Sequence, residues 1–422
     1  MESALATWRE RRAEPWIAGC SPADLRALVD GFQAGYAVGN GSRRVGLTAA
    51  DPCHFVAEFV AAVTHPAPME IFLGPPSDAE TAAPAETWVM IPTGGTTAAP
   101  RYAVHTWASL AAAARGLQAW LGGGPIHSAC FLPLAHVSGF MQVVRTFLTG
   151  GKLTLANWSD IQAGNFPRPE AGAVTSLVPT QLARLLDVPG AMHWLRSFRA
   201  VFLGGAPAWP DLLERARREQ LPLAPCYGMT ETAAQVTTMA PEDFLAGRAG
   251  VGRALPHARI AIVGDDGTVR PSGAEGRVRI KGGSLCRGYF PHATPQPDAF
   301  LTHDRGRLND RGELTILGRV DAVINSGGEK IDPGEVEAAI RATGAVADVA
   351  VFAMPDAQWG EVVVAAVAPA TLDTEILRAQ LRHRLPAYKI PKRWVGVSTI
   401  PYNRAGKIDR EALGTLATAA AG

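Results

Sequence analysis

A short run of small and hydroxyl residues, placed between a strand pattern and a cation, is the first feature that could perform chemistry. The run is Thr93-Gly94-Gly95-Thr96-Thr97, which follows a β-rich stretch at 86–91 and precedes Arg101. Glycines let backbone N–H groups approach an oxyanion, threonines add hydroxyl donors, and arginine supplies a planar positive charge. The pattern predicts a polyphosphate-binding loop. It also fits an ordinary turn, and it lacks the Gly-Lys-Ser/Thr ending of a Walker loop.

Four further segments place polar side chains in predicted turns. Tyr227-Gly228-Met229-Thr230-Glu231 follows an apolar run, and its carboxylate could hold Mg²⁺, which keeps most of its waters. Thr302-His303-Asp304 carries a carboxylate that could accept two ribose hydroxyls. Gly327-Gly328 lies beside opposite charges, and Lys407 follows another turn near the C-terminus. Each segment alone is also compatible with a surface turn.

Composition limits the classes of protein that the chain could belong to. The 422 residues predict two or three domains, and a formal net charge of +1 gives no reason to expect a nucleic-acid partner. The five cysteines form no close pair, which argues against a disulfide framework or a zinc cluster. The charged N-terminus does not resemble a signal peptide, and no apolar run reaches the roughly 18–20 residues that span a bilayer. We expect a cytoplasmic protein without membrane insertion.

Strand and helix patterns alternate through the first 230 residues. Apolar runs at 129–132, 174–177, 200–203 and 223–226 predict buried strands, and helical patterns start at Ser21-Pro22 and Asp51-Pro52 and span 106–121, 140–148 and 180–186. This alternation predicts an α/β fold with a parallel sheet, whose ligands bind at the carboxyl ends of the strands.

The pattern of predicted secondary structure changes towards the C-terminus. From about Arg259, short alternating strands and Gly/Asp turns predict a β-rich subdomain. From Asp321 onward, helices at 335–340 and 374–383 and strands at 346–352 and 362–367 predict a small α+β module.

Taken together, these segments resemble the acyl-adenylate-forming ligases, the superfamily of acyl- and aryl-CoA synthetases, adenylation domains and luciferases. The resemblance extends from about Trp88 to Arg410. It rests on the loop from Thr93 to Arg101, Gly204-Gly205-Ala206-Pro207, Tyr227-Gly228-Met229-Thr230-Glu231, Asp304, Gly318-Arg319-Val320-Asp321, Gly327 to Glu335, and Pro401 to Lys407. Within the superfamily the chain is most similar to the o-succinylbenzoate–CoA ligases, through Pro133 to Gly139, Ser176 to Leu182 and Asp304-Arg305-Gly306.

The resemblance implies an architecture and an activity. It implies a large adenylation domain over 1–318, a hinge at 319–321 centred on Asp321, and a mobile C-terminal domain over 322–422. The implied enzyme is an AMP-forming ligase that uses ATP, Mg²⁺ and coenzyme A to convert o-succinylbenzoate to its CoA thioester in menaquinone or phylloquinone biosynthesis. Its partners would be these small molecules, and a homodimer is compatible with the sequence.

The resemblance also implies roles for individual residues. Lys407, Glu231, Thr230 and Arg145 would be catalytic, with Glu231 also at the metal. The nucleotide, and in the second step CoA, would be bound by Thr93, Gly94, Gly95, Thr96, Thr97, Arg101, Gly205, Ala206, Tyr227, Gly228, Asp304, Arg319, Gly327 and Gly328. The acyl pocket would be lined by His136, Ser138, Gly139, Arg145 and Gly204.

Several alternatives stay open from the residues themselves. Gly94, Ala98, Arg101 and His303 stand where the family usually has serine, glycine, lysine and glycine, which bears on rate and nucleotide affinity. Arg145, inside an apolar helix pattern, either extends to solvent or pairs with an anion, and His136 could be a packed core residue. The enzyme could act on another aryl or acyl acid, or be a nucleotide-binding relative without turnover.

Overall fold

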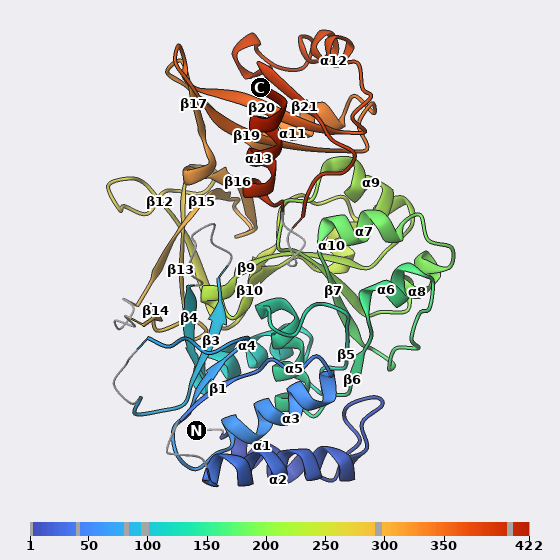
Figure 1. The fold of residues 1–422 in the computed structure, drawn as a ribbon, viewed down its shortest axis with the longest axis vertical. Helices are drawn as coiled ribbons and strands as arrows, with labels where there is room; N and C mark the ends of the chain where they lie inside the picture. Colours follow the sequence, from blue (N-terminus) through green and yellow to red (C-terminus); the bar gives the residue numbers. More distant parts are fainter. Residues whose placement is uncertain are drawn as a thin grey trace.

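The computed structural model describes residues 3–38, 43–79, 84–93, 101–291, 298–402 and 408–421, and within these ranges the strands form four sheets (Figure 1). Three sheets belong to the large N-terminal part of the chain, and the fourth lies in the C-terminal part at the top of Figure 1. The predicted α/β fold with a smaller α+β unit is confirmed. None of the described helices is long and apolar enough to cross a membrane.

The first sheet contains the strands on either side of the glycine–threonine run. Its order is β1 (Arg44–Gly46), β2 (Glu70–Phe72), β3 (Trp88–Pro92), β4 (Tyr102–Thr106) and β14 (Tyr289–Phe290). Strands β3 and β4 are antiparallel, with Pro92 opposite Tyr102, so the run lies in a hairpin connection. The helix predicted over 106–121 is confirmed as α4 (Trp107–Trp120). The strand between the loop and this helix, β4, was not predicted from the sequence.

Helix α3 (Pro52–Val63) packs against β2 of the first sheet, and α1 (Ala4–Arg11) and α2 (Pro22–Val38) pack against α3 (Figure 1). The Asp51 side chain accepts the His54 N–H and begins α3 as expected for an N-cap. Phe55, Phe59 and Val60 of α3 are buried in the core that this sheet shares with α5.

The second sheet is the parallel sheet that the sequence predicted. Its order is β11 (Arg253–Ala254), β10 (Ala234–Thr238), β9 (Leu223–Met229), β8 (Ala200–Leu203), β7 (Val174–Leu177), β5 (Ser128–Cys130) and β6 (Leu153–Leu155). The pairs from β6 to β9 are parallel, whereas β10 and β11 pair antiparallel.

Helices cover both faces of this sheet because its strands are apolar on both sides. Val201 and Leu203 of β8 enter one core and Phe202 enters another, as the two-residue period of a strand requires. The helices are α4 (Trp107–Trp120), α5 (Val137–Thr149), α6 (Trp158–Gln162), α7 (Pro179–Leu185), α8 (Ala191–Arg196), α9 (Pro210–Arg218) and α10 (Pro241–Leu245).

The third sheet is antiparallel and corrects one prediction. It consists of β12 (Ala258–Val263), β13 (Glu275–Gly282), β15 (Phe300–Leu308) and β16 (Leu314–Arg319). Asp304 was predicted to lie in a turn, but it lies inside β15. The buried positions of β15 are Thr302, Asp304 and Gly306, and they alternate with exposed residues as in any strand. The prediction failed because these buried positions are polar or glycine and therefore do not give the apolar alternation that indicates a strand.

A second correction concerns the segment after the 223–226 run. Tyr227, Gly228 and Met229 were predicted as loop residues, but they continue β9. The strand extends because β10 pairs alongside it, with Gly228 opposite Gln235 and Met229 opposite Ala234. Only Thr230–Thr232 leaves the strand, as the 3₁₀ turn η1.

The C-terminal part has its own core. Strands β17 (Ile324–Ser326), β18 (Glu329–Ile331), β19 (Asp348–Asp356), β20 (Gly360–Ala368) and β21 (Arg393–Gly396) form one sheet with α11 (Pro333–Arg341), α12 (Thr374–Leu381) and α13 (Arg410–Ala421). Short 3₁₀ turns lie at η2 (Val320–Ala322) and η3 (Ala387–Lys389). The buried clusters on the two faces of this sheet contain only residues from 324 onward.

A buried arginine fixes the end of α5. Arg11 is 4% exposed, and its guanidinium donates to the carbonyl oxygens of Thr146, Phe147 (3.1 Å) and Gly151 (2.5 Å). These carbonyls belong to the last turn of α5 and to the residue after its αL cap at Gly150, and the Thr146 carbonyl also accepts the Gly150 and Gly151 N–H groups. Arg11 therefore holds the C-terminal end of α5 in place.

Replacing Arg11 should destabilise the protein. In Arg11→Met the three carbonyls lose a charged donor while the apolar stem is kept, so we expect a loss of about 3 kcal/mol in the free energy of unfolding, measured by urea denaturation. Arg9→Met, at an exposed position of the same helix, is the matched control and should change stability by less than about 0.5 kcal/mol. Equal stabilities of the two variants would remove this role from Arg11.

Candidate active site

The carboxyl ends of the parallel strands carry several of the predicted site residues. Gly204 follows β8, and its N–H donates to the Leu177 carbonyl at the end of β7 (3.2 Å). A Cβ on Gly204 would lie 2.8 Å from the Cys226 sulfur, so only glycine lets the two segments approach this closely. Gly205 has a φ of +82°, which glycine adopts without strain, and Ala206 is exposed beside it.

Tyr227, Asp304 and Arg319 lie together although they are far apart in the sequence. The Tyr227 hydroxyl donates to Asp304 Oδ2 (2.5 Å), and Arg319 Nη1 lies 3.6 Å from Asp304 Oδ1. Asp304 is opposite Arg319 in the β15–β16 pair. Burial, and next the charge of Asp304, raise the pKa of the Tyr227 hydroxyl, which therefore stays a donor. This network holds one carboxylate at the point where the second and third sheets meet.

Arg319 also pairs with Asp321 in the predicted hinge. Its Nε and Nη2 donate to the two Asp321 carboxylate oxygens (2.7 and 2.5 Å), and His303 Nδ1 lies 3.2 Å from Asp321 Oδ2. The hydrogen bond from Arg319 lowers the pKa of the Asp321 carboxyl. The guanidinium thus links a carboxylate of β15 to one of η2.

The base of the predicted phosphate loop is closed by its own backbone. Both the N–H and the hydroxyl of Thr93 donate to the Arg101 carbonyl (2.8 and 3.1 Å). The Arg101 guanidinium stacks on the Tyr289 ring at 4.1 Å from its centroid. The Tyr289 hydroxyl donates to Glu231 Oε1 (2.7 Å). The loop and the Thr230-Glu231 turn are therefore connected through one aromatic side chain.

The carboxylate of Glu231 is the candidate metal ligand. Within the described ranges, no three His, Cys, Asp or Glu side chains gather as a metal-binding group. A single carboxylate still suits Mg²⁺, which keeps several waters and takes its other ligands from substrate phosphates. The Glu231 carboxylate accepts a hydrogen bond from the Tyr289 hydroxyl, and burial raises the pKa of that hydroxyl, so Tyr289 stays a donor.

A buried histidine contacts the Thr230-Glu231 turn. His105 of β4 is fully buried; its Nε2 lies 2.8 Å from the Thr230 carbonyl and its Nδ1 3.0 Å from Ser109 Oγ. Burial lowers the pKa of His105 to about 4, so the ring is neutral at neutral pH. The two residues after the turn have a strained backbone, because Ala233 (φ 51°) and Ala234 (φ 78°) occupy the left-handed region.

Helix α5 carries the predicted acyl-pocket residues. His136 is at its N-cap, and Ser138 follows in the first turn. A Cβ on Gly139 would lie 2.3 Å from the Pro133 carbonyl oxygen, so the helix start requires glycine there. Ser138 and Arg145 are seven positions apart, which places them on one helix face.

Arg145 does not reach solvent. It is 3% exposed, and its Nη2 donates to Gln235 Oε1 (2.5 Å) of β10. Burial lowers the pKa of Arg145 to about 10, so it remains a cation at neutral pH. The interpretation that Arg145 extends to solvent is wrong.

Gly327 and Gly328 form the turn between β17 and β18, with φ of +61° and +87°. A Cβ on Gly327 would lie 2.5 Å from the Trp359 ring. Five predicted site residues lie outside the described residues, so their roles stay predictions. They are Gly94, Gly95, Thr96, Thr97 and Lys407.

Sequence reasoning missed three residues of this region: Tyr289, His105 and Gln235. Each is an isolated polar or aromatic residue in a short strand, without a motif around it. The available signal was polarity in an otherwise apolar strand, since such residues are buried only when they have a partner.

Comparison with known proteins supplies the family. The model of the AMP-binding enzymes matches residues 39–290, and that of the AMP-binding enzyme C-terminal domain matches residues 335–407. The chain belongs to the AMP-binding enzyme family. Its residues from the glycine–threonine loop to Glu231 lie within the first match, and Asp304 and Arg319 lie between the two.

Individual relatives of this AMP-binding enzyme agree with one another. The chain is 34% identical over 343 residues to the 2-succinylbenzoate–CoA ligase of Enterococcus faecalis, covering 79% of this chain and 69% of the relative. Its fold is similar to o-succinylbenzoate CoA synthetase from Bacillus subtilis in complex with the acyl-adenylate intermediate OSB-AMP (TM-score 0.77, 24% identity, 96% and 97% of the two chains). It is also similar to that synthetase in complex with ATP and magnesium ion (TM-score 0.77, 23% identity, 97% and 99%).

The depressed pKa of His105 predicts a pH dependence of stability. The ordinary histidine pKa is about 6.5, and burial lowers the pKa of His105 to about 4. Between these values the unfolded chain binds a proton that the folded chain does not, so stability falls as the pH drops from 6.5 towards 4. His105→Gln keeps a donor and an acceptor but cannot titrate. We expect it to flatten the slope of unfolding free energy near pH 5 by about 1.4 kcal/mol per pH unit.

Urea unfolding at several pH values between 4.5 and 7 measures this slope. His193→Gln, at an exposed position, is the control and should keep the wild-type slope. An unchanged slope in His105→Gln would contradict a neutral, buried His105.

Proposed function

We propose that this AMP-binding enzyme is an AMP-forming o-succinylbenzoate–CoA ligase of menaquinone or phylloquinone biosynthesis. It would activate o-succinylbenzoate as an acyl-adenylate and transfer the acyl group to coenzyme A. The relatives named above support this function. The single observation that carries it is Arg145, a buried cation whose side-chain partner is a neutral amide.

Arg145 lacks a protein counter-ion among the described residues. Its nearest titratable neighbours include Cys130 and Cys226, and burial raises the pKa of both thiols to about 12, so they are neutral. An uncompensated buried charge costs several kcal/mol. o-Succinylbenzoate has a second, aromatic carboxylate that does not react, and we propose that this group pairs with Arg145 in the acyl pocket beside His136, Ser138, Gly139 and Gly204.

The nucleotide would lie across the carboxyl ends of the second sheet. Asp304 would accept the ribose hydroxyls, with Arg319 beside it and Tyr227 orienting the carboxylate. Gly205, Ala206 and Gly228 would border the adenine, and Thr93, Gly94, Gly95, Thr96, Thr97 and Arg101 would hold the β- and γ-phosphates. Bound at Glu231, with Thr230 next to it, Mg²⁺ would neutralise charge on the phosphates.

In the first half-reaction the succinyl carboxylate oxygen would attack the α-phosphorus of ATP. A P–O bond forms to the acyl group while the bond to pyrophosphate breaks. Negative charge grows on the transferring oxygens, so the rate depends on positioning and on cations nearby. Lys407 would supply one of these cations.

In the second half-reaction the CoA thiol would attack the acyl carbon, lose its proton and release AMP. We propose that the C-terminal domain (322–422) turns against the large domain (1–318) about Asp321, so that Gly327-Gly328 replaces Lys407 at the site. The cytoplasm, where ATP and CoA are available, stays our expected compartment, and a homodimer stays a prediction.

Lys407→Ala separates the two half-reactions. The lysine cation is needed where negative charge develops, in adenylate formation, and not in attack by the thiol. We expect the variant to lose at least about a hundredfold in o-succinylbenzoate-dependent pyrophosphate release, while it still makes thioester from supplied acyl-adenylate at nearly the wild-type rate. Lys152→Ala, an exposed lysine of the large domain, is the control. Similar losses in both steps would show that Lys407 has another role.

Arg145→Ala tests the substrate assignment. Removing one partner of a buried charge pair costs about 3–5 kcal/mol, so kcat/KM for o-succinylbenzoate should fall at least about a hundredfold. Arg145→Lys should recover only part, because a point charge does not reproduce the planar fork. The affinity for ATP should hardly change.

Pyrophosphate release with a panel of carboxylic acids provides the measurement. Arg184→Ala, an exposed arginine of α7, is the matched control and should behave as the wild type. If the wild type prefers a monocarboxylic acid, or if Arg145→Ala keeps full activity on o-succinylbenzoate, the assignment of the substrate fails.

A further inference from the structure

Several buried donors beside Arg145 have no partner. Arg145 Nε and Gln235 Nε2 are buried and form no hydrogen bond within the described residues. The same holds for both ring nitrogens of His257. Buried polar groups are nearly always paired, because an unpaired group loses its water without replacement. Such a gathering of unpaired donors points to a ligand that is hydrogen-bonded when bound.

The backbone brings His257 to this cluster from the connection between β11 and β12. The Leu255 N–H donates to the Val236 carbonyl (2.8 Å), next to Gln235. The Gln235 carbonyl is near enough to favour the protonated ring of His257, although neither ring nitrogen forms a hydrogen bond with it. The positive charge of Arg145 acts on the ring in the opposite sense. His257 therefore lies near the backbone of Gln235 and within the electrostatic reach of Arg145.

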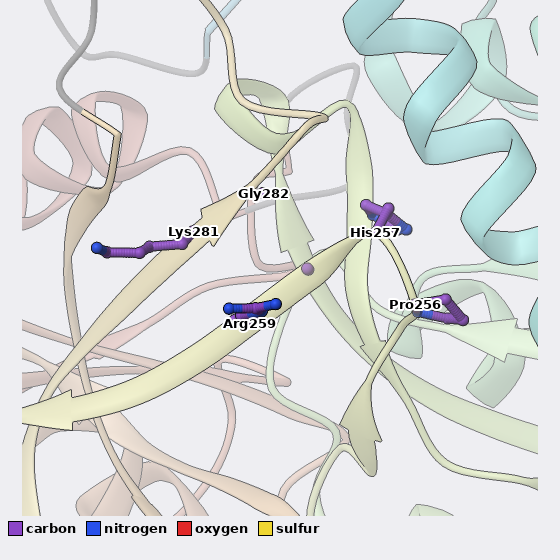
Figure 2. Close-up of a pocket in the computed structure, with 6 residues that line it drawn as sticks. Pro256, His257, Arg259, Lys281 and Gly282 are labelled. Carbon is purple, nitrogen blue, oxygen red and sulfur yellow. The ribbon is translucent and has the colours of Figure 1, made fainter.

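A glycine on α4 makes room for the imidazole. A Cβ at Gly116 would lie 1.9 Å from His257 Nδ1 and 2.6 Å from its Cγ, so no larger residue fits there while the ring keeps its position. His257 also lines a cavity of about 350 Å³ (Figure 2). Arg259 and Lys281 line the far side of that cavity, away from the imidazole (Figure 2). His257 thus lines this cavity while its ring packs against Gly116 of α4.

The charge state of His257 decides what it can offer. Burial, and next the charge of Arg145, lower the pKa of His257 to about 4. At neutral pH the ring is neutral, with one N–H donor and one acceptor nitrogen. A protonated His257 would be repelled by the positive charge of Arg145. A neutral His257 can instead donate its N–H to the same anion that pairs with Arg145.

We propose that His257 is a second recognition residue of the acyl pocket, which donates an N–H to the aromatic carboxylate that Arg145 pairs with. This inference rests on the proposed function, because it needs a substrate with a second carboxylate. An ionised carboxylate accepts up to about four hydrogen bonds. Arg145 Nε, Gln235 Nε2 and the His257 N–H are three donors from three different elements, so the group would be held in one orientation rather than merely neutralised. Gly116 is then a positioning residue, since it fixes where the ring lies.

The experiment compares o-succinylbenzoate with 4-oxo-4-phenylbutanoate, which lacks only the ring carboxylate, in pyrophosphate release. His257→Leu should raise KM for o-succinylbenzoate by about tenfold to a hundredfold, as expected for one hydrogen bond to a charged group. Its KM for the analogue should change less than about threefold. His257→Gln should recover most of the affinity, because its amide keeps an N–H. Arg259→Gln, on the outer side of the cavity, should match the wild type.

Gly116→Ala tests the position of the ring without changing its chemistry. Alanine favours a helix more than glycine does, but its Cβ would overlap the His257 side chain, so urea unfolding of the variant is measured beside its activity. We expect the same selective rise in KM for o-succinylbenzoate as in His257→Leu.

The outcomes separate this inference from the function on which it rests. If the wild type does not release pyrophosphate with o-succinylbenzoate, the proposed function fails, and the role of His257 fails with it. If the wild type is active but His257→Leu and Gly116→Ala affect both acids equally, or neither, His257 is overturned as a recognition residue while the proposed function stands.

Discussion

The guanidinium of Arg145 is a full positive charge inside the large domain, and among the described residues it is paired only with the amide of Gln235. Only 3% of Arg145 is exposed, so bulk water screens the charge little, and its cost is several kcal/mol unless an anion pairs with it. The fold tolerates this because both ends of α5 are fixed: Gly139 packs against the Pro133 carbonyl, and Arg11 holds the last turn. Because both ends of α5 are held, the helix cannot shift or rotate to bring the Arg145 charge to solvent.

One short segment connects this cation to the rest of the candidate site. From β9 through η1 to β10, Tyr227 donates to Asp304, Glu231 accepts from Tyr289, and Gln235 accepts from Arg145. Strands β9 and β10 are adjacent and antiparallel, so all three side chains have fixed spacing. The left-handed residues Ala233 and Ala234 lie between them, and backbone strain of this kind persists only where the surroundings enforce it. Ribose, metal and acyl functions, as we propose them, therefore depend on one strained turn supported by His105.

The junction between the two parts of the chain is built from charge and close contact. Arg319 pairs with Asp304 of the third sheet and with Asp321 of η2. One step before it, Gly318 has a φ of +138°, and any Cβ there would lie 2.0 Å from the Asp332 carboxylate. These contacts are polar and partly exposed, whereas the two parts of the chain have separate apolar cores. Breaking the contacts therefore exposes little apolar surface. That is the physical property a hinge requires.

The sequence by itself determined the parallel sheet, the helices that begin at Pro22 and Pro52, and the α+β module, because periodicity and capping residues are local. It also indicated the superfamily, through the order of its motifs along the chain. It also singled out Arg145, Glu231, Asp304 and Arg319. It could not determine that Asp304 lies in a strand, that Tyr289 joins Arg101 to Glu231, or that Arg145 is buried against Gln235, ninety residues away. Those contacts join residues with no common period or motif. Only the packing of three sheets around α4 and α5 brings them within hydrogen-bonding distance, and only burial makes the charge of Arg145 and the neutrality of His105 and His257 matter.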